Sequence, residues 1–176
     1  MPFLPVPFNA KAVANYFLGL GQRDSVPLSP MKLIKLVYLA HGWHLAHFDR
    51  PLINEQIEAW PYGPVISSLY HELKGYGNTP IESPLLRGTR SRKGFSFSPH
   101  SLNDEKSPER RHAAENLIDA VWDTYKDFSA VQLSAMTHQE DSPWHRTWHE
   151  RGGSKMRGTD IPQKDIKQHF KHLAAE

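Results

Sequence analysis

The sequence predicts a mainly α-helical α+β domain, with about seven helices around a central buried helix and a small β-hairpin or strand pair. Apolar residues recur at helical spacing along most of the chain. Serine–proline pairs, which are typical of helix starts, occur at residues 29–30, 107–108 and 142–143. The 176 residues, of which 39% are hydrophobic and 23% charged, suit one compact domain with a continuous core.

The first helix is predicted over residues 9–20, where apolar side chains recur at helical spacing and Gly19 and Gly21 stand at its end. Residues 1–8 precede it as an N-terminal arm. The stretch from Met1 to Pro7 has three prolines and no basic residue, so it does not resemble a signal sequence.

The second helix is predicted from Pro30 to about Phe48. Ser29 can accept a hydrogen bond from a free backbone amide, and proline fits the first helical position, where no donor is needed. Apolar residues point nearly all round this helix and leave Lys32 and Lys35 on one narrow polar stripe. That pattern is typical of a central, largely enclosed helix.

A short strand is allowed within residues 52–60, where apolar and polar side chains alternate weakly. The turn Pro61-Tyr62-Gly63-Pro64 ends it, and Pro64 is predicted to open a helix that Gly75 and Gly77 end.

Residues 78–104 are predicted to form a loop insertion, the least ordered part of the chain. Phe95 and Phe97 alternate there like one small exposed strand. Its basic run consists of Arg87, Arg90, Arg92 and Lys93.

The last third of the chain predicts four helices with clear start signals. Ser107 begins a helix through Tyr125, a capping box from Ser129 to Gln132 introduces a short helix, and Ser142 begins another. After a loop over residues 152–159, the terminal helix carries Pro162, Ile166, Phe170 and Leu173. We expect a single domain over residues 9–173.

Composition argues against several classes of protein. The 21 basic residues against 19 acidic ones give a net charge of +2, far from the charge of a dedicated nucleic-acid binder. The absence of cysteine removes disulfides and cysteine-ligated metals, and it fits a cytoplasmic protein. The longest apolar stretch, residues 33–46, is shorter than the roughly 20 residues that a bilayer crossing needs, so no membrane association is expected.

No pattern of catalytic residues stands out, so we expect no enzyme and no cofactor. His41, His44 and His47 drift around the helix by about 60° per step and cannot share one tetrahedral ion without strain. His145 and His149 lack the glutamate of the zincin pattern. We therefore expect no metal site.

Three segments resemble the Panacea domain of SocA-like antitoxins: residues 32–42 (KLIKLVYLAHG), residues 58–65 (EAWPYGPV), and Thr137-His138 through Ser142-Pro143-Trp144. Their order and spacing match the family, and the tail over residues 161–170 is similar to its closing helix. The resemblance covers roughly residues 10–172.

The resemblance implies a helical, non-enzymatic antitoxin that silences a toxin by direct contact. Its implied partner is a cognate toxin encoded by a neighbouring gene, and in one branch of the family the antitoxin also hands the toxin to a cytoplasmic protease. Neither the arm nor the basic run matches the shared core, so partner-specific surface is expected there.

Two segments are predicted to bind the partner, each with a simpler alternative. The turn over residues 60–64 holds two aromatic anchors, or it positions the following helix while Trp60 and Tyr62 pack inward. His138 and Trp144 form either a recognition edge or a loop that clasps the central helix.

The basic run with its two phenylalanines could meet phosphates and bases, which leaves a nucleic-acid-binding or phage-encoded regulatory protein as the alternative function. Four charges on a loop are more often a solvated face, so nucleic acid is disfavoured. The predicted partner-binding residues are Trp60, Tyr62, Gly63, Pro64, Arg87, Arg90, Arg92, Phe95, Phe97, His138 and Trp144.

Overall fold

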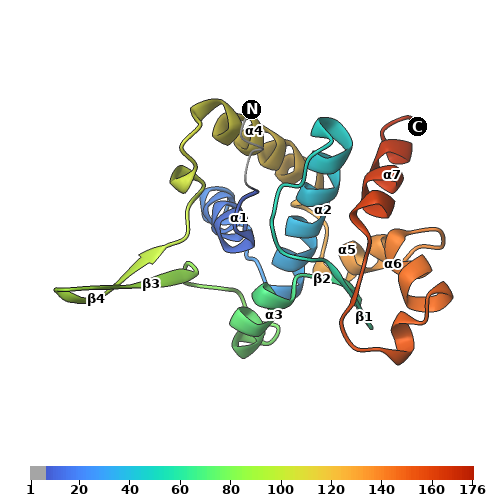
Figure 1. The fold of residues 1–176 in the computed structure, drawn as a ribbon, viewed down its shortest axis with the longest axis horizontal. Coiled ribbons are helices and arrows are strands. Elements are labelled where there is room, and N and C mark those ends of the chain that lie inside the picture. Colours follow the sequence, from blue (N-terminus) through green and yellow to red (C-terminus); the bar gives the residue numbers. More distant parts are fainter. Residues whose placement is uncertain (1–6) are drawn as a thin grey trace.

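The computed structural model describes residues 7–176, and the first six residues of the predicted arm lie outside this range. Within it the chain forms seven α-helices and two small antiparallel sheets, which confirms the predicted fold class (Figure 1). None of these helices combines the length and the hydropathy that a bilayer crossing requires.

Helix α2 (Pro30–Phe48) is the centre of the structure, as predicted. It packs against α1, α4, α5 and α7, and Leu33, Leu36 and Val37 are fully buried. Two expectations about this helix are wrong. Ser29 stands at the N-cap without a side-chain hydrogen bond. Both lysines of the expected polar stripe are buried, because neighbouring segments offer their ammonium groups backbone carbonyls.

Helix α1 (Ala10–Asp24) begins one residue later and ends four residues later than predicted. Asn9 caps it by accepting a hydrogen bond from the amide of Lys11. Gly19 and Gly21 lie inside the helix and do not end it. A Cβ at Gly21 would lie 2.8 Å from the carbonyl oxygen of Val26, so glycine is needed there for the chain to fold back closely.

The first sheet has the order β2-β1-β5 and is antiparallel throughout. Its strands are β1 (Glu58–Trp60), β2 (Gly63–Val65) and β5 (Thr159–Asp160). Pro64 therefore does not open a helix but pairs with Ala59. Helix α3 (Ser67–Leu73) begins three residues later and continues as a 3-10 turn over Lys74–Tyr76.

The second sheet is a hairpin of β3 (Leu86–Ser91) and β4 (Gly94–Pro99) that extends away from the helices (Figure 1). The expectation of one small strand in an otherwise loop-like insertion is wrong, since Arg87 and Arg90 of the basic run lie on a second strand and Arg92 and Lys93 form the turn. A short 3-10 turn, Leu102–Asp104, returns the chain to the helical body.

Helices α4 (Pro108–Tyr125) and α5 (Ala130–Thr137) have the predicted serine caps, including the full capping box of α5. Helix α6 (Pro143–His145) continues as a π-helical turn over Arg146–Glu150. The expected loop holds a 3-10 turn, Gly153–Lys155, and strand β5.

Helix α7 (Gln163–Leu173) closes the core against α2. Its Phe170 makes edge contacts with Tyr38 and Trp43 at ring-centroid distances of 5.9 and 5.2 Å. The ring also lies directly against Gly42, where any side chain would clash. The terminal helix thus packs on the central helix with Phe170 in direct contact with three of its residues.

Candidate functional site

The turn over residues 60–64, here called the clasped turn, is attached to the central helix through Lys35. The ammonium nitrogen Nζ of Lys35 donates to the carbonyls of Tyr62 and Pro64 at 2.7 and 2.9 Å. Gly63 lies between them with φ of +105°, and a Cβ there would come within 2.6 Å of Nζ and 2.9 Å of Thr137 Oγ1. Only glycine therefore fits both the backbone conformation and the space.

Three more side chains hold the same turn: one from α5, one from the residue that caps its C-terminus and one from α6. These side chains face successive backbone carbonyls. Trp144 Nε1 donates to the carbonyl oxygen of Trp60 at 2.7 Å, and Ser134 Oγ donates to that of Tyr62 at 3.0 Å. His138 Nε2 lies 3.3 Å from the carbonyl oxygen of Pro61. Every carbonyl from residue 60 to residue 62, and that of residue 64, thus has a side-chain partner. Such a network fixes the backbone of the turn.

Burial changes the acid–base properties of these groups. Lys35 is 2% exposed, and burial lowers the pKa of its ammonium group to about 7. The pKa of His138 is also lowered, mainly by burial and further by the positive charge of Lys35. A lysine with a near-neutral pKa is often a nucleophile. Here its nitrogen is enclosed and donates to two carbonyls, so its role in this arrangement is structural.

Most aromatic side chains of this region pack against other side chains of the protein. Trp144 is buried between His138 and Trp148, at centroid distances of 4.3 and 5.7 Å. Trp60 is half-buried and packs edge-on against Tyr70 at 4.7 Å. Tyr62 does not pack inward, since it is 71% exposed. The structure therefore brings the predicted residues of this region together and presents one of them, Tyr62, to solvent.

The predicted residues of the hairpin lie apart from the clasped turn, on the opposite side of α1 and α2 (Figure 1). Phe95 and Phe97 are 71% and 69% exposed. The guanidinium of Arg90 lies 5.8 Å from the ring centroid of Phe95, at cation–π distance. The predicted site residues thus fall into two separate groups.

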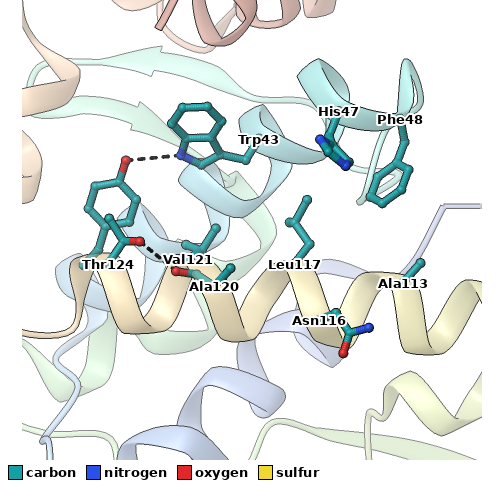
Figure 2. Close-up of a pocket in the computed structure, with 10 residues that line it drawn as sticks. Trp43, His47, Phe48, Ala113, Asn116, Leu117, Ala120, Val121 and Thr124 are labelled. Atoms are coloured by element: carbon teal, nitrogen blue, oxygen red, sulfur yellow. Dashed lines mark hydrogen bonds between the residues drawn. The ribbon is translucent and has the colours of Figure 1, made fainter. Parts of the chain in front are cut away.

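Sequence reasoning missed a third surface, a groove of about 550 Å³ between the last turns of α2 and the length of α4 (Figure 2). Trp43 Nε1 donates to Tyr125 Oη across it at 3.2 Å. The lining contains no Asp, Glu, Lys or Arg: it consists of Trp43, His47, Phe48, Ala113, Asn116, Leu117, Ala120, Val121, Thr124 and Tyr125. The spacing of the α4 residues was a signal for an apolar face, but a sequence does not show how closely two helices approach.

The remaining titratable side chains form no metal site in the part of the chain that the structure describes, where no group of three or more His, Asp or Glu side chains could hold an ion. The rings of His145 and His149 lie in tilted contact at a centroid distance of 4.7 Å, next to Glu150.

Together, the fold and these surfaces define a small helical domain that presents aromatic side chains and an apolar groove to solvent. The family model described as "Antitoxin SocA-like, Panacea domain" matches residues 33–145. Antitoxin SocA of Caulobacter vibrioides (strain NA1000 / CB15N) is 32% identical over 172 residues, covering 95% of this chain and 85% of that protein. No solved structure matches the chain. The chain therefore belongs to the SocA-like Panacea-domain family, which confirms the resemblance drawn from its motifs.

Proposed function

We propose that this protein is an antitoxin that neutralises a cognate toxin by direct protein–protein contact in the cytoplasm, without catalysing a reaction. Membership of the SocA-like family and the likeness to a protein named as an antitoxin support the general role. The enclosed amine of Lys35 supports the non-catalytic part, because the one amine with a strongly lowered pKa among residues 7–176 is engaged in holding the clasped turn.

The observation that carries the contact mechanism is the hairpin β3–β4. An isolated two-stranded hairpin is marginally stable in water unless a face is covered. Here the six residues of β3 are all exposed, and two large aromatic rings of β4 face solvent. A regular element that leaves apolar surface uncovered is typical of a protein–protein interaction site.

The additional role as an adaptor for a protease has no support of this kind. No feature of the described surface distinguishes a protease contact from a toxin contact. We therefore restrict the proposal to neutralisation by binding.

Co-expression with the adjacent reading frame tests the proposal. The neighbouring gene product is expected to arrest growth when induced alone, and this protein is expected to restore growth and to co-purify with it. A neighbour that arrests growth equally in both cases, without forming a complex, would contradict the proposal. Trp144→Ala, which removes a buried side chain, serves as the control that shows how a destabilised fold affects the restoration of growth.

A further inference from the structure

We infer that the hairpin binds an acidic segment of the toxin, whose apolar side chains cover one face of the hairpin while its carboxylates pair with the cations near the hairpin tip. This inference rests on the proposed function and specifies the partner chemistry of the same surface.

One face of the hairpin carries an apolar strip of Leu86, Phe97 and Phe95, with Arg90 at the end nearest the tip. Register pairs Gly88 with Phe97 and Arg90 with Phe95, and Leu86 lies two residues before Gly88 on the same face. A Cβ at Gly88 would lie 3.3 Å from the ring of Phe97, so this ring extends across the glycine. Leu86, which is 45% exposed, lengthens the strip toward the helical body. A partner that covers this face would bury three large apolar side chains.

The same hairpin carries an unbalanced positive charge. Residues 86–99 contain four basic and no acidic side chains. Only Arg87 is neutralised locally, through two hydrogen bonds to Asp104 at 2.8 and 2.9 Å. Arg90, Arg92 and Lys93 form no ion pair with any side chain of residues 7–176. These three cations lie within four residues around the turn, beside the apolar strip.

This combination favours an acidic protein over the other occupants. A second copy of the chain would place three cations against three, and like charges in an interface oppose association. Nucleic acid gains from stacking on aromatic rings. Leu86 offers no such stacking, whereas an apolar protein side chain packs on it as well as on the rings. Carboxylates on the partner satisfy the cations, and apolar residues between them fit the strip.

The test measures binding to the co-purified toxin by titration calorimetry for three proteins: wild type, the variant with Arg90→Glu, Arg92→Glu and Lys93→Glu, and the variant with Phe95→Ser and Phe97→Ser. Both variants are expected to weaken the toxin Kd at least about tenfold. Raising salt from about 50 to about 500 mM is expected to weaken wild-type binding, and the charge-reversed variant is expected to lose this dependence.

Two control variants carry the same kinds of substitution, a charge reversal and an apolar-to-serine change, at exposed positions outside the hairpin. Lys164→Glu on α7 reverses the charge of an exposed lysine that forms no ion pair with residues 7–176, and Val131→Ser on α5 removes an apolar side chain that is 74% exposed. Both are expected to bind within about twofold of wild type. Unchanged circular dichroism spectra and melting temperatures would show that all variants are folded.

Each other outcome contradicts one part of this inference or the proposed function itself. If wild type restores growth and both hairpin variants bind normally, the hairpin is not the interface, while the proposed function stands. If only the serine variant weakens binding, the partner is not acidic at this surface. If wild type binds a single-stranded 20-mer oligonucleotide more tightly than the toxin, the hairpin is a nucleic-acid site. If wild type fails to restore growth, the proposed function itself is wrong.

Discussion

The clasped turn and the hairpin are both rich in aromatic residues and glycine, yet the structure uses them in opposite ways. In the turn, side chains from α2, α5 and α6 occupy four backbone carbonyls, and Trp60 packs against a neighbouring ring. In the hairpin, Phe95 and Phe97 face solvent, and Arg90, Arg92 and Lys93 form no ion pair with residues 7–176. Aromatic content alone therefore does not distinguish a structural motif from a binding surface.

What distinguishes them is whether the polar groups around the aromatic side chains are already satisfied. A turn with four of its five carbonyls engaged by side chains gains little from a new partner and loses much when one contact is removed. A hairpin with unpaired charges and uncovered apolar area gains much from a new partner and loses little stability when one of its side chains is removed. We accordingly propose that the turn maintains the fold and that the hairpin contacts the toxin.

The largest effect on stability is expected at the clasp. Trp144→Ala removes a buried indole, its stacking on Trp148 and its hydrogen bond to the Trp60 carbonyl. The free energy of unfolding should fall by about 3–5 kcal/mol in urea melts, because transfer energy is lost and a cavity remains. A loss below about 1 kcal/mol would show that the clasp is not a structural element.

A pair of glycine substitutions compares the two regions directly. Gly63→Ala should destabilise the protein by about 2–4 kcal/mol, since both the positive φ and the contacts with Lys35 and Thr137 are unfavourable. Gly94→Ala in the hairpin has a similar φ of +116° but nothing within 4 Å of the new Cβ. It should lose only about 1 kcal/mol of backbone energy. Equal losses in thermal melts would mean that the turn is not tightly held.

The pH dependence of stability should report on Lys35. Burial lowers its pKa to about 7, below the value of 10.5 for a free lysine, so between these values the unfolded chain binds a proton that the folded chain does not. The free energy of unfolding should therefore rise with pH across this window, by up to about 1.4 kcal/mol per pH unit. Lys35→Met should make this rise smaller, and burial of Lys32, which also lowers its pKa, accounts for a remaining rise. Parallel curves for the two proteins from pH 7 to 10 would contradict the enclosed position of the amine.

The smallest effect on stability is expected in the hairpin. Phe95→Ser combined with Phe97→Ser should change the free energy of unfolding by no more than about 0.5 kcal/mol, because both rings are already in water. Denaturant melts of the variant and wild type should superimpose. A loss of several kcal/mol would mean that the rings stabilise the isolated protein.

Local signals in the sequence predicted the starts of the helices with serine–proline pairs, but not the end of α1 or the start of α3. The pairs Ser29–Pro30 and Ser107–Pro108 mark the starts of α2 and α4, and Ser129 and Gln132 predict the capping box of α5. These features depend on residues within a few positions of one another. The central helix was equally clear, because its apolar residues surround the whole axis.

The site was harder to predict because it depends on contacts between distant segments. A helical wheel placed Lys35 on a polar stripe, but only the fold shows that a turn 27 residues away supplies its hydrogen-bond acceptors. Strand β3 consists of Leu-Arg-Gly-Thr-Arg-Ser, which lacks the apolar alternation that identifies a strand. Its pairing with β4 is what makes it a strand.

Hydrogen–deuterium exchange of the free protein and of its toxin complex tests the division of roles most directly. Amides of residues 58–65 should exchange slowly in both states, whereas those of residues 86–99 should exchange rapidly in the free protein and become protected in the complex. Protection that appears at the clasped turn while the hairpin continues to exchange rapidly would contradict the account.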